Sequence, residues 1–142
     1  MSNLDPVQQA IERQNATAMR SYTTGDVESL VSIVAEDAWQ MPPNRPALVG
    51  RAAIREFWAA AFSWGKWDFT LDTRAIAVSG PLAVERGKYV LRFTASADAP
   101  PGMTSFEDRG NYLVHWRREG DEQWLVVADA PVSELPLQVT GQ

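Results

Sequence analysis

Three side chains in the second half of the chain have the chemistry needed for proton transfer. Glu85, Asp108 and Tyr112 fall in runs where polar and apolar residues alternate, as in strands with one buried face. Alternation places all three on the inner face. A buried carboxyl without a partner has a raised pKa, so Glu85 is the candidate acid or base. The alternative is that Glu85 is paired with an arginine or a backbone donor, or solvated at a strand end, and has only a structural role.

The spacing of the two acids argues against a carboxylate pair. A hairpin turning at residues 100–101 would place Glu85 opposite Trp116 and Phe93 opposite Asp108. Glu85 and Asp108 would then lie roughly 25 Å apart along the strands. We therefore expect Asp108 at the rim of the inner face, near the hairpin loop.

The other polar residues offer weaker patterns. His115, the single histidine, is expected on the outer face, and the alternation of the last strand turns Val126 and Ala128 inward and Asp129 outward. No cluster has the spacing of metal ligands, and no phosphate-binding glycine motif occurs. We expect no metal and no cofactor.

Helices and strands that would position these residues can be read from the spacing. Asp5 and Pro6 mark the start of a first helix that ends at Gly25. Asp26 begins a second, whose apolar stripe runs to Val34. Next come a short strand at 38–41, a proline-rich bend and a third helix. The residues of this helix expected to be buried are Ile54, Phe57, Trp58, Ala61 and Phe62. Four strands are then expected at 66–78, 82–96, 104–118 and 123–133.

This order of elements predicts an α+β fold. Three N-terminal helices would pack in a curved antiparallel sheet, with one sheet face turned to the interior. The 142 residues, 45% of them hydrophobic, suit one domain spanning 1–142. The net charge of −5 argues against a nucleic-acid partner. Neither a signal peptide nor a membrane span is apparent, so we expect a soluble, cytoplasmic protein.

Three short segments resemble a known family. Gly25-Asp26, residues 35–38 (AEDA) and residues 50–58 (GRAAIREFW) are similar to the opening of the ketosteroid isomerases, in the nuclear transport factor 2-like superfamily. The later segments, ERGKYVLRF and DRGNYLVHWRRE, are similar to an uncharacterised bacterial branch near the SnoaL-like proteins. The resemblance implies a cone-shaped, cystatin-like α+β barrel with a pocket for a small apolar molecule.

The resemblance also indicates which residues would line that pocket and which would react. The family's general base aligns with Pro42 and its helical tyrosine with Ala18, neither of which can do that chemistry. Its sheet acid aligns near Tyr112, which could donate to an oxyanion. Glu85 and Tyr112 are therefore the candidate catalytic residues. The candidate ligand-binding residues are Trp39, Met41, Trp58, Tyr89 and Trp116.

Two functions from different classes remain open at the level of sequence. The first is a cofactor-independent isomerase, cyclase or dehydratase-like acid/base enzyme, or a binding protein, for a small apolar molecule. The second is a non-catalytic dimerisation or association module, because superfamily members also pair through the outer sheet face. Apolar and basic residues mix on that face: Val84, Val90 and Leu113 with Arg86, Arg92, His115 and Arg117. A homodimer is expected in either case.

Overall fold

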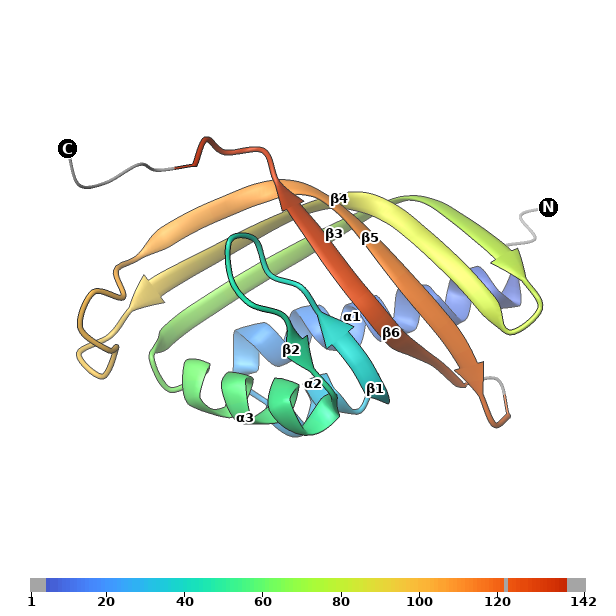
Figure 1. Cartoon of the computed structure of the whole chain (residues 1–142), viewed down its shortest axis with the longest axis horizontal. Coiled ribbons are helices and arrows are strands. Elements are labelled where there is room, and N and C mark those ends of the chain that lie inside the picture. Colours follow the sequence, from blue (N-terminus) through green and yellow to red (C-terminus); the bar gives the residue numbers. More distant parts are fainter. Residues whose placement is uncertain (1–4, 122, 138–142) are drawn as a thin grey trace.

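A computed structural model describes residues 5–121 and 123–137 of the chain (Figure 1). The helices are α1 (Pro6–Thr24), α2 (Val27–Val31) and α3 (Arg51–Ala61). The strands are β1 (Val34–Gln40), β2 (Leu48–Val49), β3 (Gly65–Ser79), β4 (Leu82–Ala95), β5 (Phe106–Glu119) and β6 (Gln123–Ser133). The predicted α+β class is confirmed, and each long strand ends within two residues of its expected bounds.

Local signals in the sequence fix both ends of α1. The Asp5 carboxylate accepts a hydrogen bond from the Val7 backbone nitrogen at 2.9 Å, and Gly25 ends the helix in the left-handed conformation with φ 70°. The second helix is shorter than predicted. It ends at Val31, and Val34 belongs to β1 rather than to the helical stripe. The apolar run that ends at Val34 is compatible with a helix or a strand. Its last part becomes a strand because it pairs with β6.

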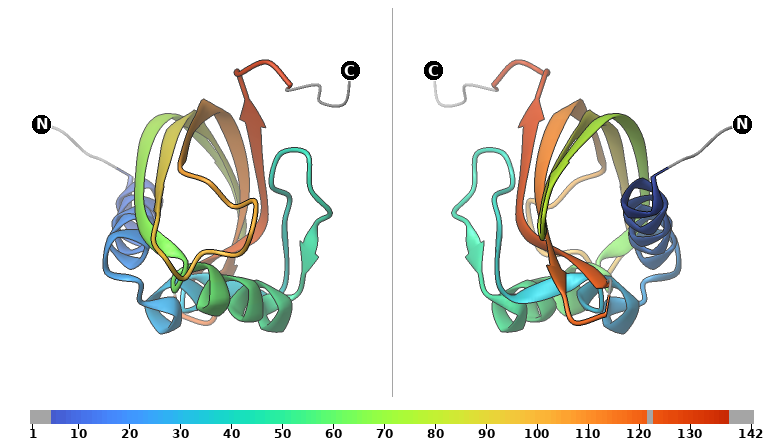
Figure 2. Two further views of the ribbon diagram at one scale, coloured as in Figure 1. Left: turned by 90° about the vertical axis from the view of Figure 1, so that its left-hand side faces the viewer. Right: turned by 90° about the vertical axis from the view of Figure 1, so that its right-hand side faces the viewer.

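The sheet has six strands in the order β2-β1-β6-β5-β4-β3. Strands β3 to β6 form the predicted antiparallel meander, and β1 adds to its far edge in parallel with β6. The sheet is strongly curved, and the three helices pack on one side of it (Figure 1). Viewed along the strands, the bend between β1 and β2 rises beside β6 (Figure 2).

The pairing of β4 with β5 differs from the predicted register by two residues. Glu85 pairs with Val114 rather than Trp116, and Leu91 rather than Phe93 pairs with Asp108. The hairpin is centred at residues 99–100, one residue earlier than expected. Moving the centre of a hairpin by one residue moves the register by two, which keeps every side chain on its predicted face.

A bulge in β6 overturns the predicted direction of Asp129. Trp116 pairs with Val126 and His115 with Ala128, so Val127 is an extra residue in β6. One extra residue reverses the alternation beyond it. Asp129 consequently faces the interior, where the sequence pattern had turned it outward.

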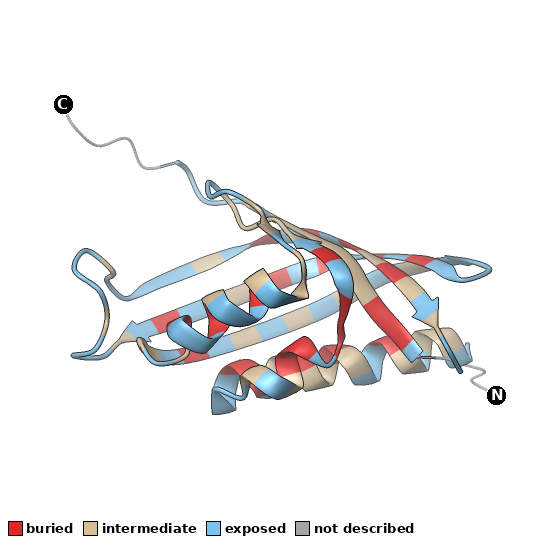
Figure 3. Ribbon diagram, turned by 60° about the horizontal axis from the view of Figure 1, so that its bottom comes forward, coloured by how far each residue is buried: buried red, intermediate tan, exposed pale blue. Residues whose placement is uncertain are grey.

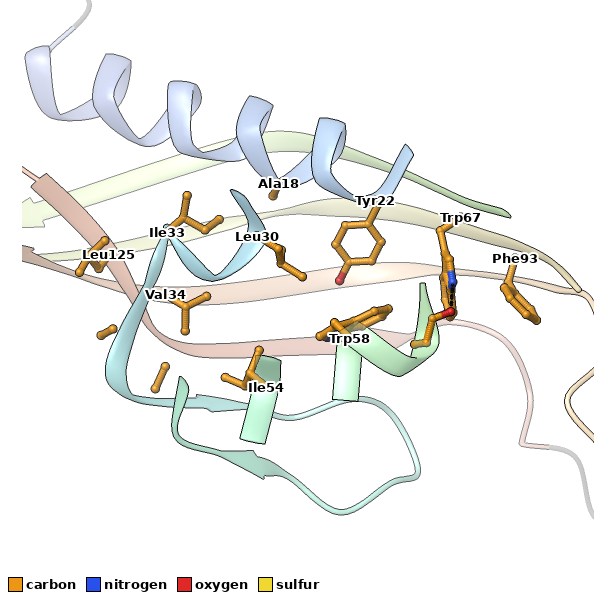
Figure 4. Close-up of a cluster of buried hydrophobic side chains, with 13 residues drawn as sticks. Ala18, Tyr22, Leu30, Ile33, Val34, Ile54, Trp58, Trp67, Phe93 and Leu125 are labelled. Carbon is orange, nitrogen blue, oxygen red and sulfur yellow. Dashed lines mark hydrogen bonds between the residues drawn. The ribbon is translucent and has the colours of Figure 1, made fainter. Parts of the chain in front are cut away.

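Aromatic residues make up much of the core between the sheet and the helices. The rings of Tyr22 on α1 and Trp58 on α3 pack edge to face, with centroids 4.8 Å apart (Figure 4). Trp67 on β3 packs 5.1 Å from Trp58 and donates its indole N–H to the Ala61 carbonyl at 2.8 Å. Buried and exposed residues alternate along the strands facing this core (Figure 3). Among the described residues, no helix is long and apolar enough to cross a membrane.

Candidate functional site

A cavity of about 610 Å³ lies between the inner face of the sheet and the helices. Most of its lining is apolar and aromatic, and a few polar side chains project into it. Its mouth is where lining residues are exposed to solvent, among them Asn44 and Arg45 in the bend after β1, Phe106 at the start of β5, and residues 135–137. A cavity of this size and composition suits a small, mostly apolar molecule.

Five of the seven residues singled out from the sequence line the cavity. They are Trp39, Trp58, Tyr89, Tyr112 and Trp116. Met41 and Glu85 do not line it. Met41 was expected inside a strand at 38–41, but β1 ends at Gln40 and its alternation does not extend to Met41.

Glu85 lies fully buried behind the cavity wall and accepts four hydrogen bonds. Its Oε2 atom accepts from the Tyr112 hydroxyl at 2.5 Å, the Thr73 hydroxyl at 2.8 Å and the Asn15 amide at 2.9 Å, and its Oε1 atom accepts from the Trp116 indole at 3.0 Å. These donors satisfy a buried carboxylate without a cation, so neither an arginine nor solvent is needed. We call Glu85 with these four donors the Glu85 cluster.

The Tyr112 ring reaches this cluster because it crosses a glycine. Tyr112 pairs with Gly87 on β4, and not with Tyr89 as the predicted register had it. A Cβ atom at Gly87 would lie 2.5 Å from Cζ of Tyr112. The absence of a side chain at Gly87 therefore lets the tyrosine lie flat across β4 and point its hydroxyl at Glu85.

Asp108 lies at the cavity wall, tied to two hydroxyl groups. It accepts hydrogen bonds from Tyr89 at 2.7 Å and from Ser133 at 2.6 Å. Burial raises the pKa of Tyr89, and the hydrogen bond to Asp108 adds to this effect. Asp108 joins β4, β5 and β6 near the mouth, six residues along β5 from the Val114 that pairs with Glu85.

The carboxyl group with the fewest partners in the cavity is that of Asp129. Its one hydrogen bond is a long one, 3.4 Å from the Gln40 amide nitrogen, and no ion pair reaches it within the described residues. Burial raises the pKa of Asp129 to about 6, with a further contribution from the negative charge of Glu85. Asp129 and Glu85 both pair with Val114, from opposite sides. They thus lie two strand spacings apart, about 10 Å.

Gln40 links Asp129 to the aromatic core. Its side-chain oxygen accepts the Trp58 indole N–H at 2.7 Å, which leaves the amide nitrogen to face Asp129. Burial raises the pKa of Tyr22 far above its usual value, and the charge of Asp129 raises it further. A hydrogen bond with the Gln40 side chain lowers this pKa, but by less than burial raises it. Tyr22 is therefore a neutral hydroxyl that lines the cavity, as does the Asp129 carboxyl group, whose pKa is raised to about 6.

Sequence reasoning missed Asp129, Gln40 and Tyr22. A bulge hides Asp129, and Tyr22 reads as one more apolar position of α1. The sequence did contain one signal for the surroundings of Glu85. Asn15 interrupts the apolar stripe of α1, and its amide donates the hydrogen bond that α1 contributes to Glu85. Among the described residues, no group of three acidic or histidine side chains is arranged to hold a metal ion.

The family model of the SnoaL-like domain matches residues 16–127 of the sequence. The chain belongs to the SnoaL-like family. The match runs from α1 to the bulge of β6, so this SnoaL-like domain includes the helices and most of the sheet around the cavity. No curated protein matches the sequence.

Solved structures of the nuclear transport factor 2-like superfamily share the fold of this SnoaL-like domain. A superfamily protein from Salmonella enterica serovar Typhimurium is 18% identical over 94% of each chain, with a TM-score of 0.77. A ketosteroid isomerase-like protein from Erwinia carotovora is 19% identical, covering 90% of this chain and 96% of its own, with a TM-score of 0.74. A structure named for a calcium/calmodulin-dependent protein kinase II association domain, from Xanthomonas campestris, is 16% identical over 91% and 87%, with a TM-score of 0.66. These identities establish the fold alone.

Proposed function

We propose that this SnoaL-like domain binds a small apolar carbonyl compound in its cavity and moves a proton at the carbon next to the carbonyl. One observation carries the proposal: Asp129 faces a mostly apolar cavity and has, within the described part of the chain, a single long hydrogen bond and no cation beside it. A carboxyl group in such surroundings exchanges its proton near neutral pH, which suits a general acid or base.

The reaction would begin with Asp129 ionised. Its carboxylate removes the proton from the carbon adjacent to the carbonyl. The electron pair of the C–H bond forms a carbon–carbon double bond, and the π pair of the carbonyl moves to its oxygen, which gives an enolate. Tyr22, kept protonated by its raised pKa, can donate a hydrogen bond to that oxygen. Asp129 then returns the proton to the same carbon or to another carbon of the conjugated system. Such transfer is the common step of isomerisations and aldol-type cyclisations.

Glu85 and Tyr112 take a positioning role in this proposal. The Tyr112 hydroxyl already donates to Glu85 at 2.5 Å, so it is not free to stabilise an oxyanion. Glu85 has no contact with the cavity, and its charge acts on Asp129 through the sheet. The acid/base role for which the sequence offered Glu85 as a candidate is therefore assigned to Asp129, which lines the cavity.

The proposal predicts that the protein accelerates exchange of carbon-bound hydrogen in a simple ketone. The probe is β-tetralone, a bicyclic apolar ketone, followed by proton NMR in deuterium oxide with the protein present at catalytic concentration. We expect a rate well above that in buffer, rising with pH as Asp129 loses its proton around pH 6 and level above about pH 7. A rate equal to that of buffer, under conditions where the ketone is shown to bind, would contradict the proposal.

The outer sheet face supports a second function, association between two copies. Leu113 and Val84 are large apolar residues there with 51% and 41% of their surface exposed, and several arginines surround them. We propose a homodimer through this face, a mode consistent with the relative named for an association domain.

Sedimentation velocity tests this association. We expect twice the chain mass of 15.8 kDa for the unaltered protein and a monomer for Leu113→Lys, because a charge at the centre of a desolvated interface is costly. The matched control is Val49→Lys, which places the same charge at an exposed residue of edge strand β2. A monomeric unaltered protein, or a Leu113→Lys variant that stays dimeric, would contradict the homodimer.

A further inference from the structure

Arg45 differs from the other cavity-lining residues in its charge. Among the described residues it is the one basic side chain that lines the cavity, and it lies at the mouth, in the bend between β1 and β2. The acidic residues of the lining are Asp108 and Asp129. The lining thus carries a positive group on the bend between β1 and β2 and negative groups on strands β5 and β6.

The bend holds Arg45 in a restricted position. Pro42 and Pro43 precede it, Pro46 follows it, and Asn44 adopts the left-handed conformation with φ 60°. The Arg45 guanidinium lies 5.7 Å from the centre of the Phe57 ring, which in turn packs 5.1 Å from Trp58. A guanidinium stacked on an aromatic ring keeps its hydrogen-bond donors free at the edge of the stack.

No ion pair joins Arg45 to an acidic side chain within residues 5–121 and 123–137. Five other arginines of the described residues form ion pairs, among them Arg92 with Glu107 and Arg117 with Asp37. The other arginines without an ion pair do not line the cavity; they are Arg13, Arg20, Arg51, Arg86 and Arg118. In a protein with a net charge of −5, a basic group without an acidic partner at the mouth of a cavity is a distinct electrostatic feature.

We propose that Arg45 determines ligand specificity by pairing with an anionic group, a carboxylate or similar oxyanion, at the end of the ligand that lies at the mouth. This inference rests on the proposed use of the cavity as a ligand site. The ligand is then an apolar carbonyl compound with an acidic end. Repulsion from Asp129 keeps that end out of the interior, while Arg45 holds it at the mouth, which presents the apolar part to Asp129.

Two fluorescent dyes with the same ring system separate charge recognition from apolar binding. Anilinonaphthalene sulfonate carries an anion, and N-phenylnaphthylamine is its uncharged counterpart. We expect Arg45→Met to weaken binding of the sulfonate dye about tenfold and to change that of the neutral dye by less than about twofold. Added salt should weaken binding of the sulfonate dye but not binding of the neutral dye. Arg45→Lys, which keeps the charge, should retain most of the affinity.

Arg118→Met is the matched control, because it removes the same charge from an exposed residue of β5 that does not line the cavity. It should leave both dyes unaffected. If Arg45→Met leaves the affinity for the sulfonate dye unchanged, or lowers the affinity for both dyes equally, the role of Arg45 is overturned. Failure of the neutral dye to bind the unaltered protein would overturn the cavity as a ligand site and the Arg45 inference with it.

Discussion

Substitution of Asp129 by asparagine is expected to slow the exchange of β-tetralone hydrogen by about a hundredfold or more. General acid and base groups contribute roughly this factor, and an amide cannot accept the proton. The asparagine oxygen can still accept the Gln40 amide, so the geometry of the wall is kept. NMR exchange rates of the two proteins at pH 7.5, with equal binding of the neutral dye, measure the effect.

The stability of the same variant distinguishes lost chemistry from lost structure. The pKa of Asp129 is raised from 3.8 to about 6 in the folded protein. The folded state therefore binds this proton more tightly than the unfolded state, and the associated stability is lost as the pH rises through about 6. Above that pH the charged Asp129 costs about 1–3 kcal/mol, so Asp129→Asn should unfold at an equal or higher temperature at pH 7.5. A normal exchange rate in this variant would rule out Asp129 as the base.

Changes at Glu85 should have their largest effect on stability. Glu85→Ala leaves the Asn15, Thr73, Tyr112 and Trp116 donors of the Glu85 cluster without an acceptor in a buried site. We expect a loss of about 3–5 kcal/mol in the free energy of unfolding, measured by urea denaturation. Glu85→Gln keeps one acceptor oxygen and turns one amide group toward donors, so its expected loss is smaller, about 1–2 kcal/mol.

The activity of Glu85→Gln tests the positioning role. Because the charge of Glu85 raises the pKa of Asp129, its removal should move the acidic limb of the exchange profile to lower pH and leave the plateau rate within a few-fold. A fall of about a hundredfold in a folded Glu85→Gln protein would instead make Glu85 the base. Thr73→Val is the control for stability. It removes a single donor of the Glu85 cluster, so we expect it to lower the free energy of unfolding by less than Glu85→Ala does.

The faces of β4 and β5 could be predicted from the sequence, but the partners across them could not. Alternation is a local property, and it correctly placed Glu85 and Tyr112 inward. The register depends on the centre of the 96–105 connection, where two successive turns, Ala99 to Ser96 and Met103 to Pro100, move it by one residue. The predicted register therefore gave each side chain its correct face but the wrong cross-strand partner. It paired Tyr112 with Tyr89, whereas Tyr112 pairs with Gly87 in the structure.

Asp129 shows the opposite kind of error. One bulged residue in β6 reverses the face of every later residue, and the run WLVVADAPV carries no glycine or turn signal that marks the bulge. Alignment with the isomerases directed attention to Pro42 and Ala18. Both residues line the cavity, but the ionisable side chains of the proposed chemistry are Tyr22, one helical turn after Ala18, and Asp129, from the far end of the chain.

The parallel pairing of β1 with β6 determines when such a cavity can exist during folding. Gln40 and Asp129 are 89 positions apart in sequence, whereas the hairpins of the meander join near neighbours. Closing the longer loop costs more chain entropy, so the meander can form while β1 is still unpaired. In that intermediate Asp129 would face water with an ordinary acidity. The raised pKa of Asp129 is thus a property of the completed chain closure rather than of β6 itself.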